Sequence, residues 1–187
     1  MKAPKEKVFA GGLNSLYEWV EAAVVSLVAV AILFCLFFRV VGVDGESMQN
    51  TLMHLDRLLL TSGYTEAAYG DIVVISRGSS EPLIKRVIAK GGDTVKIEDE
   101  TVYLQKAGET DYVMLEEAYV FLDPFGGYIV DVMDPVVVPE GHVFVMGDNR
   151  RNSHDSRAAD IGCVDMEDVI GKAFWRIWPL TAFGDIE

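Results

Sequence analysis

The sequence has few of the residues that bind metal ions or form disulfide bonds. Its 187 residues include two cysteines and three histidines. Cys35 lies in an apolar run and Cys163 in the polar remainder, so we expect no disulfide between them. His54, His142 and His154 lack the close spacing that is typical of zinc sites. We therefore expect no metal ion and no other cofactor.

Basic residues are also scarce. Lys and Arg together number 16 against 29 Asp and Glu, which gives a formal net charge of -13. Proteins that bind nucleic acid need clustered Lys and Arg to neutralise phosphates, so this balance argues against such a partner. Half of the residues are nevertheless hydrophobic, and the mean hydropathy is +0.23. We expect this apolar excess to be concentrated in a separate segment.

The apolar excess lies near the N-terminus. Residues 22–38 contain no charged side chain, and the apolar character extends over 19–43, interrupted only by Glu21 and Arg39. A helix rises about 1.5 Å per residue, so about 20 residues cross a hydrocarbon core of roughly 30 Å. The sequence therefore predicts a transmembrane helix at 19–43, preceded by an N-terminal segment at 1–18.

The charges that flank this span predict its orientation. Lys2, Lys5 and Lys7 precede it, whereas Arg39 alone follows it closely. The positive-inside rule places the N-terminal segment in the cytoplasm and the chain after the span outside. A cleavable signal peptide fits poorly, because such segments have roughly 7–15 apolar residues. A buried core helix also fits poorly, because 22–38 shows no amphipathic face.

The remainder, 44–187, is predicted to be a mostly β domain. Short runs of branched and aromatic residues alternate with turn signals. The predicted strands are 58–61, 72–76, 83–89, 94–97, 101–104, 128–132, 136–138, 143–146 and 172–177. We also expect a turn near 48–52 and a short helix at 166–170, with Asp165 as its N-cap. Residues 105–127 are polar and irregular, which indicates a surface loop or insertion.

One predicted strand carries two adjacent cations among apolar residues. Alternation along the strand places Leu83, Lys85 and Val87 on one face and Ile84, Arg86 and Ile88 on the other. If the strand is buried, desolvation lowers the pKa of Lys85 and allows it to act as a general base near neutral pH. An edge strand whose long side chains reach water is the alternative, and the pattern alone does not decide between them.

Two loops contain further candidate residues. Ser47 follows the span closely and lies beside Gly45, which permits unusual backbone angles, although most loop serines only cap or turn. A second loop, at 147–157, follows a predicted strand and is dense in hydrogen-bonding groups. By itself it fits a solvated loop, a calcium loop or a catalytic scaffold. Its arginines oppose a divalent cation.

Together these segments resemble type I signal peptidases, the bacterial leader peptidases with a Ser–Lys dyad. Four segments match the family's boxes in order, namely 45–52, 70–74, 85–93 and 147–157. The single span and short outer part look most like the smaller Gram-positive members. The resemblance implies an antiparallel, signal-peptidase-like β fold and a membrane-bound serine endopeptidase. It would remove signal peptides from exported preproteins at small-x-small sites during protein secretion.

The resemblance also implies roles for individual residues. Ser47 is the nucleophile, and its backbone N–H is an oxyanion donor. Lys85 is the general base, and Ser153 orients its amine. Gly45 and Met48 belong to the substrate cleft. Since some members carry a hydroxyl at the position of Gly45, the second oxyanion donor stays open.

Acidic and basic residues in the matching boxes are expected to support this dyad. The resemblance implies that Asp155 holds the site together by pairing with Arg86 or Arg157. A lysine that acts only when neutral also predicts an alkaline pH optimum. The expected partners are preprotein signal peptides and membrane lipid, with the chain acting as a monomer.

The sequence departs from the family pattern at two places. Asn50 replaces a proline in the nucleophile box, and 89–93 lack the proline of a Gly-x-Pro-Gly-Asp turn. These changes leave open a specialised relative that processes or scaffolds surface or pilus proteins. A Ser–His protease would need histidine at position 85. A self-cleaving repressor would need a DNA-binding head in place of the apolar span.

Overall fold

A computed structural model describes residues 5–186, with side chains described from residue 16 onward. Lys2 lies outside the described residues, and the side chains of Lys5 and Lys7 lie outside the described side chains. The chain divides into two compact units between Phe38 and Arg39. The first contains α1 (Lys5–Phe37), and the second contains the β-rich part of the chain.

Helix α1 is a candidate membrane span by length and composition. Its segment Leu16–Phe37 has a mean hydropathy of 2.7, and none of it is buried. This exposure contrasts with the core helix of a soluble protein, which is mostly buried. The predicted end of the helix at residue 43 is wrong, because Phe38–Gly42 form strand β1, which pairs with β2. The sequence there, Phe-Arg-Val-Val-Gly, is rich in β-branched and aromatic residues that favour a strand over a helix.

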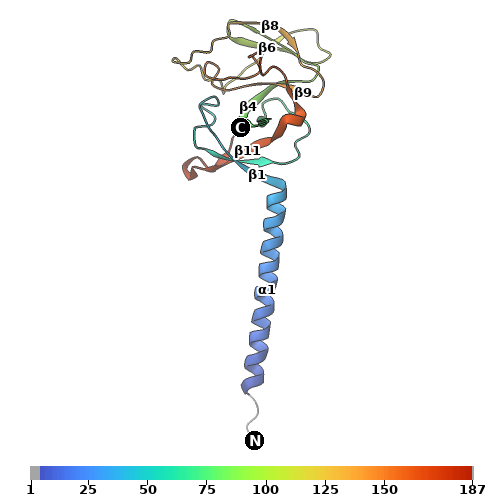
Figure 1. Cartoon of the computed structure of the whole chain (residues 1–187), viewed down its shortest axis with the longest axis vertical. Helices are drawn as coiled ribbons and strands as arrows, with labels where there is room; N and C mark the ends of the chain where they lie inside the picture. Colours follow the sequence, from blue (N-terminus) through green and yellow to red (C-terminus); the bar gives the residue numbers. More distant parts are fainter. Residues whose placement is uncertain (1–4, 187) are drawn as a thin grey trace. The chain divides into compact units, whose positions relative to one another are not determined.

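The β-rich unit contains two antiparallel sheets, which confirms the predicted fold class (Figure 1). The main sheet has the order β1 (Phe38–Gly42), β2 (Arg57–Thr61), β11 (Val169–Trp178), β3 (Ile72–Arg77), β4 (Ser80–Lys90), β9 (His142–Met146) and β10 (Val164–Asp165), with β12 (Gly184–Asp185) beside β11. The second sheet has the order β7 (Val113–Met114), β6 (Thr101–Gln105), β5 (Thr94–Glu98) and β8 (Val132–Val137). The two sheets share a core of buried residues that includes Ile88, Val95 and Phe144.

Strand β4 lies inside the main sheet, between β3 and β9. Lys85 is paired with Val73, and Arg86 is paired with Ile72 on one side and Met146 on the other. The two cations are almost fully buried, with 2% and 4% of their surface exposed. The edge-strand alternative is therefore wrong, and the buried environment that favours a neutral lysine is present.

Most predicted strands are confirmed, with two local differences. Residues 128–131 form no strand, because the Tyr128 N–H donates to Arg151 O in another loop instead of joining a ladder. The predicted helix near the C-terminus is only a 3-10 turn, η1 (Met166–Asp168), before β11 begins. Asp165 caps it as expected, accepting from the Glu167 N–H at 2.9 Å. A second 3-10 turn, η2 (Leu180–Ala182), follows β11.

Candidate active site

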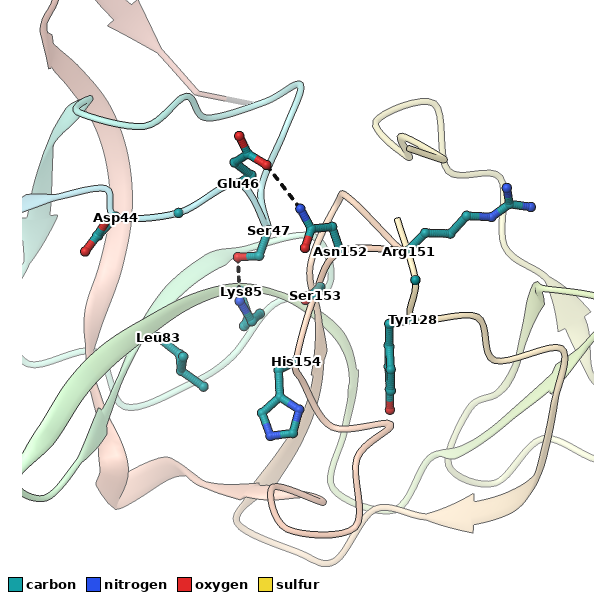
Figure 2. Close-up of a pocket in the computed structure, with 12 residues that line it drawn as sticks. Asp44, Glu46, Ser47, Leu83, Lys85, Tyr128, Arg151, Asn152, Ser153 and His154 are labelled. Atoms are coloured by element: carbon teal, nitrogen blue, oxygen red, sulfur yellow. Dashed lines mark hydrogen bonds between the residues drawn. The ribbon is translucent and has the colours of Figure 1, made fainter. Parts of the chain in front are cut away.

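Ser47 and Lys85 are in direct contact in the β-rich unit. Lys85 Nζ lies 2.6 Å from Ser47 Oγ in a hydrogen bond (Figure 2). Ser47 is half-buried in a turn after β1, whereas Lys85 is buried in β4. The structure thus brings together the serine and the lysine that the sequence singled out, with the serine accessible and the lysine shielded from water.

The turn that carries Ser47 is anchored on both sides. Gly45 has φ +93°, a backbone conformation that glycine adopts without strain. Met48 is buried in the core of the main sheet, and its carbonyl accepts from the Leu52 N–H at 2.7 Å, which confirms the predicted turn. The Ser47 carbonyl accepts from the Asn149 N–H at 3.0 Å. These contacts hold Ser47 in front of Lys85.

Burial is the main influence on Lys85. It lowers the pKa of the amine to about 8, because the charged form loses its hydration. The negative charge of Asp155 opposes this shift, and the positive charge of Arg157 adds to it. A large share of Lys85 is therefore neutral at mildly alkaline pH and able to accept a proton from a hydroxyl.

Ser153, Asp155 and Arg157 form one buried cluster beside the pair. Ser153 Oγ donates to Asp155 Oδ2 at 2.7 Å, and Arg157 Nε donates to Asp155 Oδ1 at 2.8 Å. Burial by itself would raise the pKa of Asp155, but the hydrogen bond and charge of Arg157 and the Gly147 N–H together lower it. Asp155 is therefore an ionised carboxylate that orders the loop around it.

The loop at 147–157 packs directly on the turn that carries Ser47. A Cβ added to Gly147 would overlap Ser153 Oγ and the Ser47 carbonyl oxygen. The Gly147 N–H also donates to Asp155 Oδ2 at 2.9 Å. Only a glycine allows the two loops to approach this closely.

Two cavities meet at Ser47 and Lys85. The smaller, of about 290 Å³, is lined by apolar side chains that include Val43, Met48 and Ile84, and also by the carboxylates of Asp44 and Glu81. The larger, of about 460 Å³, is lined by residues that include Gly45, Glu46, Tyr128, Asn152, Ser153 and His154 (Figure 2). Among the described residues, no group of three or more His, Cys, Asp or Glu is arranged to hold a metal ion.

The chain is similar in sequence to known peptidases. The model of the family "Signal peptidase, peptidase S26" matches residues 16–178. Signal peptidase I of Bacillus licheniformis is 36% identical over 174 residues, covering 90% of this chain and 91% of the relative. Signal peptidase I S of Bacillus subtilis is 34% identical over 172 residues, covering 90% and 92%.

The chain belongs to the signal peptidase family, peptidase S26. The family resemblance expected from the four boxes is confirmed. A signal peptidase I of known structure from Enterococcus faecalis V583 is 28% identical. It covers 57% of this chain and 96% of its own, with a TM-score of 0.44.

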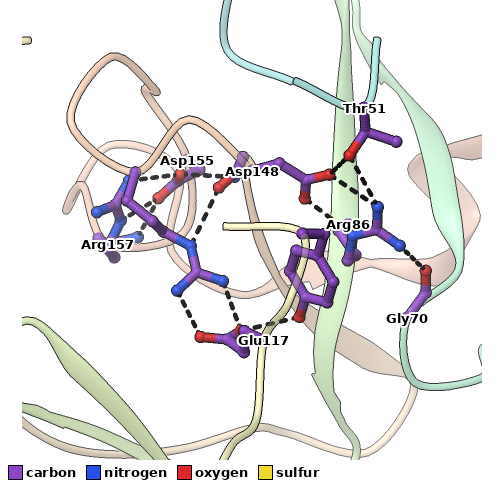
Figure 3. A network of polar contacts seen from close by, with 10 residues as sticks. Thr51, Gly70, Arg86, Glu117, Asp148, Asp155 and Arg157 are labelled. Carbon is purple, nitrogen blue, oxygen red and sulfur yellow. Dashed lines mark hydrogen bonds and ion pairs between the residues drawn. The ribbon is translucent and has the colours of Figure 1, made fainter. Parts of the chain in front are cut away.

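Arg86, the second cation of β4, does not share the hydrogen-bond partner of Lys85 (Figure 3). Arg86 Nε and Nη2 donate to the two carboxylate oxygens of Asp148 at 2.8 and 2.7 Å. Arg86 Nη1 donates to Gly70 O at 2.8 Å, and Thr51 Oγ1 also donates to Asp148. Of the two pairings expected for Asp155, the one with Arg86 is wrong. The sequence analysis did not single out Asp148 as the partner of Arg86, although a buried arginine needs a carboxylate nearby.

Residues of the segment at 105–127 also contribute to the candidate active site. Glu117 accepts two hydrogen bonds from the guanidinium of Arg150, at 2.6 and 2.5 Å, and both side chains are largely buried (Figure 3). Arg150 Nε donates to the Gly147 carbonyl at 3.1 Å. The ring of Tyr119 covers the Arg86 guanidinium at 4.0 Å. This part of the segment supports the site and is not only a surface loop.

Proposed function

We propose that this member of the signal peptidase family removes signal peptides from preproteins with Ser47 as nucleophile and Lys85 as general base. The observation that carries the proposal is the 2.6 Å contact between Ser47 Oγ and the buried amine of Lys85. The proteins with similar sequences are named signal peptidase I, which supports this substrate class. The lowered pKa of Lys85 supports its role as base.

In the proposed reaction, Lys85 accepts and returns a proton twice. Neutral Lys85 takes the hydroxyl proton of Ser47 as its Oγ attacks the scissile carbonyl carbon. The resulting ammonium gives that proton to the leaving amine, the C–N bond breaks, and the signal peptide remains as an ester on Ser47. A water molecule then loses a proton to Lys85 and attacks the ester. Returning that proton to Ser47 Oγ releases the signal peptide.

The backbone N–H of Ser47 is the proposed oxyanion donor. None of the residues that the structure describes accepts a hydrogen bond from it, so it is available to a developing negative charge. Gly45 has no side chain that could donate a hydrogen bond. The second oxyanion donor is therefore a backbone group or a group that is in place only in the substrate complex.

Ser153, Asp155 and Arg157 are proposed to position the lysine. Because Ser153 gives its hydroxyl proton to Asp155, its oxygen is left as an acceptor on the wall that it shares with Lys85. Arg157 fixes the carboxylate in turn. This chain would restrict the amine of Lys85 to orientations that face Ser47.

The smaller cavity is proposed to receive the residues before the scissile bond. The apolar part of its wall and its modest volume suit small side chains such as alanine, as expected for a small-x-small site. Val43, Met48 and Ile84 are among the residues that would contact these side chains, with Gly45 bordering the adjoining space. An extended substrate would lie along this wall.

The proposed topology follows the positive-inside rule. Helix α1 would cross the membrane, with the N-terminal segment at 1–18 in the cytoplasm and the catalytic domain at 44–187 outside. The catalytic domain would then meet cleavage sites as they leave the membrane. We propose that the protein acts as a monomer surrounded by membrane lipid at its span.

The experiment that tests this function compares three proteins in detergent. The parent, Ser47→Ala and Lys85→Ala are incubated with a preprotein that carries an Ala-x-Ala site, over a range of pH. Cleavage after that site by the parent alone, rising toward alkaline pH, is the expected result. Activity that survives in Lys85→Ala would eliminate the dyad. If none of the three folded proteins cleaves, a dedicated substrate or a non-catalytic role in surface-protein assembly becomes the better explanation.

A further inference from the structure

The larger cavity adjoins the smaller one at the dyad. Both cavities include Asp44, Ser47, Leu83 and Lys85 in their walls, so a substrate whose scissile bond lies at Ser47 can reach both. If the smaller cavity takes the small residues before the cut, the chain after the cut enters the larger cavity. This assignment rests on the proposed function.

Glu46, an acidic residue of this larger cavity, has no cation paired with it among the described side chains. Its carboxylate accepts a hydrogen bond from the neutral amide of Asn152, at 3.2 Å (Figure 2). Asp44 Oδ1 lies 3.3 Å from His54 Nδ1, which is also 3.3 Å from the Gly45 N–H. Glu46 is therefore the carboxylate of this cavity that is left without an ion pair in the part of the chain that the structure describes.

The cationic side chains at the same cavity are already paired with other acids. Arg151 points away from Ser47 in Figure 2, and its guanidinium donates to Glu100 at 3.0 and 2.7 Å. His154 is hydrogen-bonded to Asp160 at 2.8 Å. The buried pair of Asp155 and Arg157 contributes no net charge. With Lys85 neutral in the active form, the cavity carries a net negative charge.

We propose that Glu46, assisted by Asp44, selects preproteins with a basic side chain in the first residues after the scissile bond and disfavours those with an acidic one. Glu46 is adjacent to Ser47 along the chain and lines the cavity that the leaving segment enters. A Lys or Arg side chain there gains a favourable charge interaction with Glu46, whereas Asp or Glu is repelled. Tyr128 and Asn152 complete the wall without adding charge.

The test uses preproteins that differ at one residue. Each carries the same Ala-x-Ala site and has Lys, Gln or Glu at the first, second or third position after the cut. For the parent we expect the kcat/KM of the preferred Lys substrate to exceed that of its Glu counterpart by about threefold to tenfold, the size expected for an exposed charge pair. Because salt screens such interactions, this ratio should fall toward one as ionic strength rises from about 0.05 M to about 0.5 M.

Variants at position 46 identify the responsible carboxylate. Glu46→Gln should reduce the Lys-to-Glu ratio, and Glu46→Lys should reverse it. Glu109→Lys makes the same charge change at an exposed residue of the β6–β7 loop and should keep the parent ratio. Comparing ratios within each protein removes any general loss of activity. If Glu46→Lys fails to fold, the isosteric Glu46→Gln still tests the inference.

The outcomes separate this inference from the proposed function. A parent that cleaves every substrate with equal kcat/KM overturns the charge selection and leaves the peptidase in place. A ratio that persists in both Glu46 variants assigns selection to another group and also overturns the inference. A folded parent that cleaves none of the substrates overturns the proposed function, and the inference with it.

Discussion

Lys85 and Arg86 are neighbours on β4, yet their charged groups reach separate partners. The amine of Lys85 contacts Ser47 Oγ at 2.6 Å, and the guanidinium of Arg86 is held by the carboxylate of Asp148 at 2.7 and 2.8 Å. Alternation along a strand explains the separation, because successive side chains point to opposite faces. The buried arginine therefore has its own carboxylate, and no acid among the described residues is bonded directly to the lysine and would keep it protonated.

The pH dependence of activity should report the state of Lys85. Its pKa is lowered to about 8 by burial, and only the neutral form can accept the proton of Ser47. We expect kcat/KM to rise through pH 8 and to be about a hundredfold lower at pH 6 than on the alkaline plateau. Rates measured between pH 5.5 and 10 with one preprotein give the midpoint. A flat profile between pH 6 and 9 would contradict a lysine base.

Replacing Lys85 with methionine should stabilise the protein while abolishing activity. The folded pKa, about 8, is below the unfolded value of about 10.4, so below pH 8 the folded state carries the cost of a buried ammonium. Lys85→Met should raise the free energy of unfolding by about 3 kcal/mol at pH 7. The parent's stability rises with pH between about 8 and about 10, because its unfolded state then binds the extra proton, and the difference should shrink there.

Urea unfolding of Lys85→Met and the parent at pH 7 and pH 10 measures this difference. Lys96→Met, on β5, is the control and should not stabilise the protein, because the hydrogen bond with Glu98 raises the pKa of Lys96 and so favours its charged form in the folded state. A Lys85→Met protein that is less stable than the parent at pH 7 would show that the contact with Ser47 outweighs the burial of the amine.

The sequence was sufficient to single out the proposed catalytic pair but not the groups that surround it. The alternation around Lys85 and the match to the family boxes are both local patterns. They can therefore be recognised from residues that are adjacent in the sequence. Glu117 gave no such signal, because it lies in an irregular segment without periodicity and is 33 residues from Arg150. With 29 acidic residues in the chain, no local pattern specifies which carboxylate reaches a given arginine.

The end of α1 shows a different limit of sequence patterns. Residues 38–43 are apolar apart from Arg39 and Gly42, so hydropathy extends the predicted span through them. Their conformation is decided by pairing between β1 and β2, which are separated by the turn that carries Ser47. Tertiary pairing of this kind overrides local apolarity.

Gly147 should tolerate no side chain. An added Cβ would overlap Ser153 Oγ and the Ser47 carbonyl oxygen, so one of the two loops must move. We expect Gly147→Ala to lower the free energy of unfolding by about 1–3 kcal/mol and to reduce kcat more than it changes KM. Gly127→Ala is the control for stability, because its Cβ would meet nothing within 4 Å. Full activity in Gly147→Ala would show that the close approach is not required.

The Glu117–Arg150 pair should contribute more to stability than its position in an irregular segment suggests. Removing the carboxylate leaves a buried guanidinium without its two hydrogen bonds, at a cost of about 3–5 kcal/mol. We expect Glu117→Ala to lose that much free energy of unfolding. Because Arg150 also holds the Gly147 carbonyl, kcat should fall in the fraction that remains folded.

Glu116 provides the matched control for Glu117, since it is the adjacent residue and is exposed. Glu116→Ala removes the same charge without uncovering a buried cation, so its free energy of unfolding should change by less than about 0.5 kcal/mol. Urea unfolding of both variants and the parent gives the comparison. Equal effects at the two positions would mean that net charge, and not the buried pair, determines the stability of this segment. If only Glu117→Ala is destabilised, the segment at 105–127 is part of the catalytic domain's core and is not a dispensable insertion.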